Sequence, residues 1–326
     1  MIERIAELMK HETAGDPMSG LKWTRKTTEK MATELRSGGI CISPNTVGRL
    51  LKQMGYSLRV NHKQLSRVCK TAPEDRDAQF AHIAQLRKHC AASGLPLISV
   101  DTKKKELIGR FKNPGAAWNR EPIHVNDHDF PSDAAGKALP YGIYDVLANR
   151  GTIYVGTSID TAEFAVDAIE AWWLSEGRHR YDGAKGLTIL ADGGGSNGST
   201  NRLWKRDLHQ LAQRHGLTLT VAHYPPGASK WNPIEHRLFS EVSKNWAGRP
   251  LDSYETVLNY LRTTKTKAGL EVRAHLLDRH YAKGIKIADA EMRGISITWH
   301  ASLPRWNYTL HPSLIKLHRK PGLIAA

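Results

Sequence analysis

Apolar and polar residues follow two periods along this chain, one typical of buried strands and one typical of amphipathic helices. Three apolar runs are short enough to form strands, and each leads to an acid: LPLISVD (95–101), LTILAD (187–192) and LTLTVAHYPPGASKWNPIE (217–235). Short apolar runs that end at turn signals are typical of strands buried on both faces. We therefore expect Asp101 and Asp192 at strand ends, and Glu235 at the start of a helix that follows the third strand.

Between these runs the pattern predicts alternating strands and helices. Strands are expected at 95–101, 106–111, 141–147, 152–157, 187–192 and 217–222, and helices at 161–176, 201–215 and 233–246. A Gly-, Pro- and His-rich insertion occupies about 113–140. Trp172 and Trp173 continue an apolar helical stripe, which favours a place in the core over a place in a ligand site.

This alternation predicts the α/β class, with a mixed sheet covered by helices on both faces. The order of elements is typical of the RNase H-like fold, which we assign to residues 95–250. We expect a basic carboxyl-terminal extension at 251–326 to pack on this core.

Residues 1–72 have the pattern of a helix-turn-helix. A first helix is expected at about 24–36, and Ser37, Gly38 and Gly39 end it. Ser43 can cap the next helix and Pro44 suits its first position. Apolar residues then repeat at helical spacing (Val47, Leu50, Leu51 and Met54), while Asn45, Arg49 and Lys52 share the opposite face.

That polar face has the residue types with which a recognition helix contacts bases and phosphates in the major groove of DNA. An ordinary amphipathic helix with a solvated basic face is the alternative. Because the turn is longer than three or four residues, we expect a winged or divergent variant. A linker helix is expected at 73–94.

The charge of the chain favours a polyanionic partner. The formal net charge is +15 with a pI near 9.7, and the stretch between Leu35 and Pro73 holds seven basic residues, among them Arg59 and Lys63, and no acid. This distribution favours nucleic acid over a merely basic surface. No apolar run long enough to span a membrane and no disulfide framework is evident, so we expect a cytoplasmic protein without a membrane partner.

The three acids have the chemistry of a metal site for phosphoryl transfer. Carboxylates are hard oxygen ligands suited to Mg²⁺, and paired cations can activate an attacking oxygen while stabilising the leaving one. Each acid also has a structural alternative. Asp101 could accept hydrogen bonds from turn amides, and Glu235 could complete a capping box with Asn232.

The segment after Asp192, GGGSNG (193–198), matches the glycine spacing of a dinucleotide-binding loop. An acid directly before the first glycine would repel a pyrophosphate, and no acid lies between Leu208 and His223 to bind a ribose. We therefore favour a metal ligand followed by glycines that let a nucleic-acid backbone approach.

Basic and aromatic residues lie next to these acids in the sequence. Lys103, Lys104, Lys105 and Lys230 are candidates for phosphate contacts, which weaken steeply with salt. Trp231 could stack on a distorted or flipped base near the cleavage site, or could pack in the core.

Four segments carry a family resemblance: VDTKKKELIGRFKN (100–113), DFPSDAAGKALPYGIYDV (129–146), LADGGGSNG (190–198) and SKWNPIEHRLFSEVSKNWAGRPL (229–251). From about Thr13 almost to the carboxyl end, the chain resembles the DDE-type insertion-sequence transposases of the ISAzo group. The NPIEH element is also similar to mariner-like transposases.

The resemblance implies an RNase H-like core with Asp101, Asp192 and Glu235 as its acidic triad and a helix-turn-helix for the ends of the element. It implies metal-dependent cleavage and strand transfer with two Mg²⁺ ions, for which Mn²⁺ could substitute. The expected partner is double-stranded DNA, as terminal inverted repeats and as target, bound by a homo-oligomer at the nucleoid. Two alternatives stay open, a nuclease that only hydrolyses and a helix-turn-helix regulator without catalysis.

One departure from the family concerns the amino end. Members of this group generally have more helical sequence before the region that matches Leu21–Gly55. The resemblance therefore predicts a shortened copy that lacks part of the DNA-binding region, although its catalytic motifs are intact.

Overall fold

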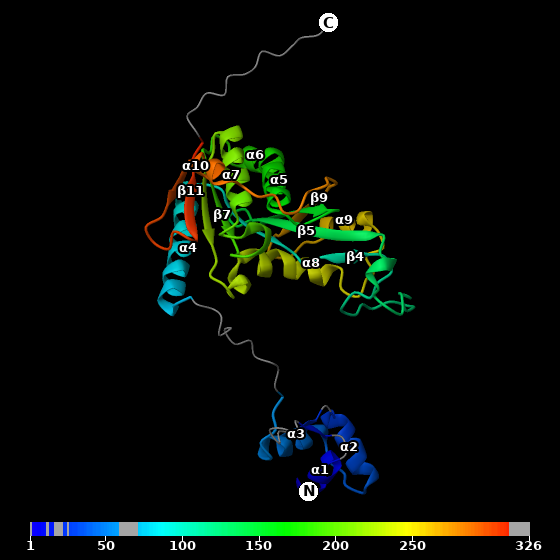
Figure 1. Ribbon diagram of the computed structural model, residues 1–326. Coiled ribbons are helices and arrows are strands. Elements are labelled where there is room, and N and C mark those ends of the chain that lie inside the picture. Colours follow the sequence, from blue (N-terminus) through cyan, green and yellow to red (C-terminus); the bar gives the residue numbers. More distant parts are fainter. Residues whose placement is uncertain (1, 11–12, 16–21, 25, 59–70, 313–326) are drawn as a thin grey trace. The chain divides into compact units, whose positions relative to one another are not determined.

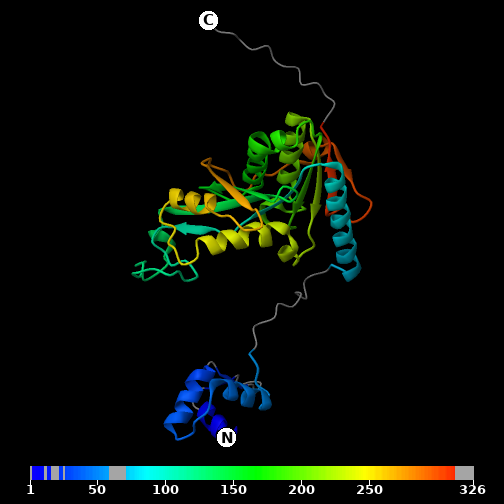
Figure 2. The same ribbon diagram turned by 180° about the vertical axis from the view of Figure 1, so that it is seen from behind.

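The computed structural model describes residues 2–10, 13–15, 22–24, 26–58 and 71–312 (Figures 1 and 2). The chain divides into two compact units, Met1–Leu65 and Ser66–Ala326. Arg59 and Lys63, both expected to contact DNA, lie outside the described residues. Within the described ranges, no helix is long and apolar enough to cross a membrane.

Three helices build the first unit: α1 (Ile2–Lys10), α2 (Thr28–Ser37) and α3 (Pro44–Gln53). A short antiparallel pair, β1 (Thr13–Gly15) and β2 (Lys22–Thr24), lies between α1 and α2. The helices bury a small shared core of Ile5, Met31, Ala32, Leu35 and Val47. Helix α2 begins four residues later than expected, because the Thr27 side chain caps it by accepting a hydrogen bond from the Lys30 amide at 3.1 Å.

The start of α3 confirms the predicted capping. The Ser43 hydroxyl accepts a hydrogen bond from the Thr46 amide at 3.2 Å, and Pro44 is the first helical residue. Val47 is buried, whereas Asn45, Arg49 and Lys52 are exposed together on the other side. The helix therefore has the two faces that its sequence predicts, and contact of the exposed face with DNA remains a prediction.

The second unit is built on a mixed sheet with the strand order β10-β11-β8-β7-β3-β5-β6-β9. Its centre consists of β3 (Leu97–Thr102), β5 (Gly136–Asp145), β6 (Arg150–Gly156), β7 (Gly186–Ala191) and β8 (Thr218–His223), and β4 (Glu106–Ile108) pairs with β5. The β3-β5-β6 neighbours are antiparallel and the β3-β7-β8 neighbours are parallel. This central order and these directions confirm the RNase H-like fold.

Helices cover both faces of the sheet (Figure 1). On one face lie α5 (Ala162–Trp172), its π-helical continuation η2 (Trp173–Gly177), α6 (Arg178–Arg180) and α7 (Arg202–His215). The opposite face carries the π-helical turn η5 (Glu235–Phe239), α8 (Ser240–Asn245) and α9 (Tyr254–Arg262). Trp172 and Trp173 are 1% and 5% exposed in the core of the first face, so the prediction that they are core residues is confirmed.

The residues after 250 continue the sheet at both of its edges. β9 (Glu271–Leu277) pairs in parallel with β6, and β11 (Asn307–Leu310) pairs with β8 and with β10 (Ile297–Trp299). A short helix, α10 (Asp289–Arg293), precedes β10. The sequence did not predict these strands, because β11 has only four residues and charged side chains interrupt β9. The expected basic extension therefore contributes to the central sheet itself.

Helix α4 (Pro73–Ser93), expected as a linker helix, packs against this sheet. Its Ile83 and Cys90 share a buried cluster with Leu97 of β3 and Leu190 of β7. The buried Gln79 amide donates hydrogen bonds to the His223 carbonyl at 2.9 Å and to Asn307 Oδ1 at 2.7 Å. Helix α4 is thus part of the second unit, and its Gln79 is hydrogen-bonded to both β8 and β11.

Candidate active site

Asp101 and Asp192 lie next to each other at the carboxyl ends of two neighbouring parallel strands. In the register of β3 and β7, Val100 is opposite Ala191. Asp101 directly follows Val100 and Asp192 directly follows Ala191. Neighbouring strands are about 4.8 Å apart. The structure therefore brings these two carboxylates to one edge of the sheet.

Glu235 approaches this edge from the helix on the opposite face. It is the first residue of η5, and the segment before it is fastened to β3. The Ser99 hydroxyl donates to Asn232 Oδ1 and accepts a hydrogen bond from the Ile234 amide at 3.2 Å. π-helical turns are rare and are frequent at functional sites.

Close packing holds the same helix against β5. Gly142 is opposite Asp101 in the β3–β5 register. A Cβ atom at Gly142 would lie 2.5 Å from Phe239 and 2.8 Å from Ile234. The missing side chain at position 142 thus lets the helix that carries Glu235 lie directly on the sheet.

The capping alternative for Glu235 is not observed. Among the described residues, the Asn232 backbone amide donates no hydrogen bond to the Glu235 carboxylate. The turn η5 also has no side-chain cap. Asn232 is fully buried, and its amide group binds Ser99 and the Val100 carbonyl instead. Glu235 is left for another role.

The acids act on one another electrostatically. Burial raises the pKa of Asp101 to about 8, with further contributions from Asp192, Glu235 and a fourth carboxylate, Asp160. Burial also raises the pKa of Asp192, and again Glu235 and Asp160 contribute. Like charges raise each other's pKa only over short distances. All four carboxylates therefore share one electrostatic environment.

Sequence reasoning missed Asp160. This acid follows β6, and its Oδ1 accepts a hydrogen bond from the Thr102 hydroxyl at 3.3 Å. The available signal was an acid four residues beyond a buried strand, VGTSID (155–160), before the cap of the next helix at Thr161. Such an acid normally belongs to helix capping, so only the fold reveals its place beside Asp101.

Tyr141 forms the inner wall of the site. Its pKa is raised by burial and by the charges of Asp101, Asp160 and Asp192. Its hydroxyl donates a hydrogen bond to Asn197 Oδ1 at 2.9 Å, which ties β5 to the glycine-rich segment after Asp192. The Tyr141 side chain therefore holds the segment after Asp192 against strand β5.

The glycine-rich segment does not open directly into a helix, as a dinucleotide-binding loop does. Residues Gly195–Asn197 form a separate 3₁₀ turn, η3. Helix α7 begins only at Arg202, where the Asn201 side chain accepts from the amides of Leu203 and Trp204. The amides at this helix end are thus already satisfied by protein, which favours the metal-ligand interpretation of Asp192.

A buried polar chain lies behind Asp192. The Trp204 indole donates to the Tyr308 hydroxyl at 2.9 Å, and that hydroxyl lies 3.3 Å from His223 Nε2. His223 Nδ1 is 2.9 Å from the carbonyl oxygen of Asp192. Since a carbonyl can only accept, Nδ1 carries the proton. Burial lowers the pKa of His223 to about 4, so the ring is neutral at pH 7.

The predicted phosphate-binding lysines have different surroundings. Lys103 is occupied, because its ammonium lies 3.0 Å from Glu106 and 4.6 Å from the centre of the Trp246 ring. Lys104, Lys105 and Lys230 are exposed. The three exposed lysines can reach a polyanion without breaking an ion pair that the described residues contain.

Trp231 is an exposed aromatic residue next to the Glu235 helix. It is 57% exposed. Its ring is nearly perpendicular to that of Phe80, with the ring centroids 6.1 Å apart, and the Lys230 ammonium lies over its ring at 5.2 Å. This exposure argues against the alternative that Trp231 packs in the core. Because the Lys230 ammonium lies over this ring, stacking of Trp231 on a base remains a prediction.

The donor chemistry at this edge fits a hard divalent cation. Carboxylate oxygens are the preferred ligands of Mg²⁺, and a cation would relieve the repulsion that raises the pKa of Asp101 and Asp192. Across the described ranges, no group of three or more His, Cys, Asp or Glu side chains is already arranged to hold a metal ion.

One comparison with known proteins gives a family for this chain. A family model described as "Rhodopirellula transposase DDE domain" matches residues 4–312. No curated protein matches the chain significantly in sequence.

Solved structures with a similar course of the chain include three of Mos1 transposase. The paired-end complex with left transposon end is 14% identical, covers 80% of this chain and 69% of its own, and has a TM-score of 0.42. The strand transfer complex is 15% identical, with coverages of 80% and 69% and a TM-score of 0.42. The mariner paired end complex with Mn is 16% identical, with coverages of 80% and 70% and a TM-score of 0.42.

Proposed function

Because this chain belongs to the family of the Rhodopirellula transposase DDE domain, which is an enzyme family of DNA cleavage and strand transfer, we propose that Asp101, Asp192 and Glu235 are its catalytic acids. The observation that carries the proposal is the register of β3 and β7, in which Asp101 and Asp192 are neighbours. The charge of Glu235 contributes to the raised pKa of both aspartates. A chain that only bound DNA would have no need to concentrate costly like charges at one buried edge.

The acids would hold divalent cations, two Mg²⁺ ions with Mn²⁺ as a substitute. Asp101, Asp192 and Glu235 would hold these ions. Ions bound there would supply activation of the attacking oxygen and stabilisation of the leaving one. Asp160 is close enough to influence both aspartates and would orient Thr102 beside them.

The protein's own residues would then position the DNA for two successive in-line attacks on phosphodiester phosphorus. Water is the nucleophile in the first attack and the released 3′-hydroxyl is the nucleophile in the second. Ser99 and Asn232 keep Glu235 beside Asp101, and Tyr141 and His223 keep the segment after Asp192 in place. Preorganised groups of this kind save reorganisation energy at the moment of reaction.

DNA would be held by surfaces on both units. We propose that Asn45, Arg49 and Lys52 of α3 read the ends of the element, together with Arg59 and Lys63. Near the acids, Lys104, Lys105 and Lys230 would contact phosphates and Trp231 would stack on an unpaired base. Binding at two DNA ends by a homo-oligomer, and a location at the nucleoid, complete the proposal.

The first test is Asp192→Asn on a duplex that contains an end of the element. We expect Mg²⁺-dependent nicking to be lost while the dissociation constant for the duplex stays within about twofold. Asp182→Asn, which changes an exposed aspartate before β7, is the control and should nick normally. Full nicking by Asp192→Asn would refute the catalytic assignment.

A joining assay separates the alternative functions. A transposase should join a 3′-ended oligonucleotide of the element to plasmid DNA, whereas a nuclease with the same fold would only cut. A regulator would bind the oligonucleotide and do neither. In the same assay, Trp231→Ala should impair paired ends more than ends that are already unpaired, and equal impairment of both would remove the stacking role.

A further inference from the structure

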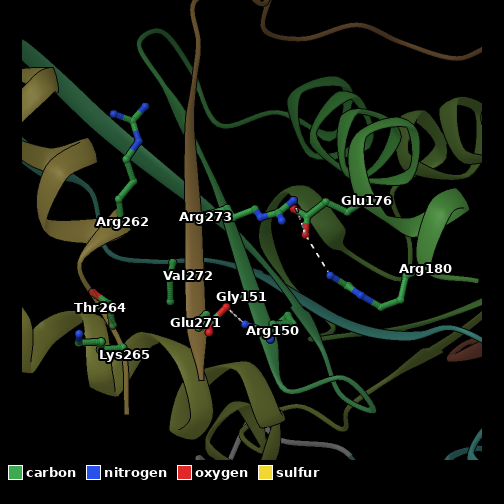
Figure 3. A pocket seen from close by; sticks show the side chains of 10 residues that line it. All are labelled: Arg150, Gly151, Glu176, Arg180, Arg262, Thr264, Lys265, Glu271, Val272 and Arg273. Atoms are coloured by element: carbon green, nitrogen blue, oxygen red, sulfur yellow. Dashed lines mark hydrogen bonds and ion pairs between the residues drawn. The ribbon is translucent and has the colours of Figure 1, made fainter. Parts of the chain in front are cut away.

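A second polar site lies at the other end of the sheet, far from the acids. It is a cavity of about 500 Å³ lined by Arg150, Gly151, Glu176, Arg180, Arg262, Thr264, Lys265, Glu271, Val272 and Arg273 (Figure 3). Arg150 begins β6, whereas Asp160 follows the opposite end of the same strand. Seven strand residues span about 20 Å, so this cavity, here called the basic pocket, is separate from the active site.

Two buried carboxylates organise the back wall of the basic pocket. Glu176 accepts a hydrogen bond from the Thr152 hydroxyl at 2.7 Å and forms ion pairs with Arg180 at 3.2 Å and Arg273 at 3.4 Å. Figure 3 shows both guanidinium groups directed at Glu176. Arg180 also binds the fully buried Asp145 at 2.8 Å. These contacts fix the two arginines. The charge of Arg180 is largely compensated by its two carboxylate partners, Glu176 and Asp145.

The outer wall offers cations that are less engaged. The Arg273 side chain is 64% exposed and has one ion pair, at 3.4 Å. Lys265 is exposed, and its backbone pairs with Glu271 in an isolated antiparallel bridge. In the turn that follows, the Gly269 amide donates to the Thr266 carbonyl and Asn149 donates to the Ala268 carbonyl. A fixed backbone presents these cations with little loss of conformational entropy.

The charge of the basic pocket is positive even after its acids are counted. Five of the ten lining residues are Arg or Lys and two are Glu, so the lining carries a net charge of +3. Asp145, which pairs with Arg180, and Glu255, which pairs with Arg262 at 3.6 Å, together reduce this to +1. Arrays of Arg and Lys around a polar cavity are suited to phosphate groups, which Arg binds in a bidentate manner.

We propose that the basic pocket binds backbone phosphates of a stretch of DNA other than the one that reacts at the acids. The inference rests on the proposed function, since it requires that the chain acts on DNA. None of the ten lining residues, all within the described part of the chain, is aromatic. A free nucleotide would therefore find no ring on which its base could stack, which favours the backbone of a longer nucleic acid.

The separation of the two sites sets the length of DNA involved. About 20 Å corresponds to roughly six base pairs at 3.4 Å each. A phosphate in the basic pocket thus belongs either to a distant part of the same duplex or to a second duplex. In both cases a contact at this pocket adds to affinity without taking part in the chemistry.

The test compares two full-length variants that lose the same charge. Lys265→Gln/Arg273→Gln removes the two outer cations, and Glu176 keeps Arg180 and Thr152 as partners. Lys286→Gln/Arg293→Gln removes one exposed lysine and one exposed arginine outside the basic pocket. Binding of a fluorescein-labelled 30-base-pair duplex is measured by anisotropy over a series of KCl concentrations.

We expect the pocket variant to reduce the slope of log K against log[KCl] by about two, because each phosphate contact contributes about 0.9. The control variant should change the slope by less than half as much. Should the pocket variant be unfolded by circular dichroism, Lys265→Gln alone should reduce the slope by about one. An unchanged slope, or an equal change in the control, would overturn the inference.

Two further arms separate the possible causes of failure. If ATP or pyrophosphate raises the melting temperature of the wild type but not of the pocket variant, and the DNA slope is unaffected, the site binds free phosphates and the DNA assignment is overturned. Nicking by wild type with unchanged slopes would overturn only the basic pocket. Absence of metal-dependent nicking in folded wild type would instead count against the proposed function.

Discussion

The side chains of Ser99 and Asn232 are hydrogen-bonded to each other, two residues before Asp101 and three residues before Glu235. Both are fully buried, and the Ser99 hydroxyl also accepts from the Ile234 amide at 3.2 Å. One serine thus joins the strand that carries the first acid to the helix that carries the last. The two acids are 134 residues apart in sequence, and this contact helps to make them neighbours.

Ser99→Ala tests this connection. The change leaves Asn232 Oδ1 and the Ile234 amide buried without the hydroxyl, which costs about 1–3 kcal/mol of stability. We expect the nicking rate to fall at least tenfold while the dissociation constant for DNA is unchanged. Ser132→Ala, at an exposed serine, should leave both quantities as in wild type. A nicking rate within twofold of wild type for Ser99→Ala would show that Glu235 is held by other contacts.

Gly142→Ala should push the Glu235 helix away from the sheet. Its new methyl group would meet Phe239 at 2.5 Å and Ile234 at 2.8 Å, and overpacking of this kind typically costs about 1–3 kcal/mol. Gly186→Ala is the matched change in another strand, where the nearest atom is 3.7 Å away. Urea unfolding should show a lower midpoint for Gly142→Ala only, together with slower nicking.

The raised pKa of Asp101 predicts how the stability of the metal-free protein depends on pH. The folded protein holds the proton up to about pH 8, whereas the unfolded chain releases it near 3.8. Between these values the folded state binds more protons, so the free energy of unfolding falls as pH rises through about 8. Thermal unfolding in EDTA at pH 5 to 9 should show this decline, and Asp101→Asn should flatten it.

Asp160→Asn provides a second variant for the same measurement. It removes one of the like charges that raise the pKa of Asp101, so the decline in stability should persist but shift to lower pH. An identical pH profile in wild type and Asp101→Asn would mean that another group titrates in this window.

Much of the catalytic core could be predicted because its strands are apolar on both faces. LISVD and LTILAD are read as buried strands from composition alone, and the acid at the end of each is visible without a structure. The start of α3 could also be predicted from the sequence, because Ser43 and Pro44 are local signals whose effect does not depend on tertiary contacts.

The features that could not be predicted depend on contacts between distant segments. Asp160 looks like a residue before a helix cap until β6 and β3 are placed in one sheet. Similarly, β11 has four residues and becomes a strand only because β8 offers it a partner edge. Asn232 looks like a helix cap in sequence, yet its side chain is used by Ser99, since a buried hydroxyl needs a partner.

Tyr308 connects the carboxyl-terminal strand β11 to Asp192, and Tyr308→Phe tests whether this connection matters. The tyrosine is fully buried, and its hydroxyl accepts from Trp204 and faces His223. Phenylalanine fills the same space but leaves the indole N–H and His223 Nε2 without that partner, at a cost of about 1–3 kcal/mol. We expect a lower melting temperature and slower nicking, because His223 would no longer be held toward the Asp192 carbonyl.

Tyr260→Phe is the control, because Tyr260 is not part of the hydrogen-bonded chain from Trp204 to Asp192. It should change neither the melting temperature nor the nicking rate. Slower nicking without any change in melting temperature would indicate that the polar chain acts on Asp192 directly, whereas normal nicking in a destabilised Tyr308→Phe protein would limit β11 to a structural role.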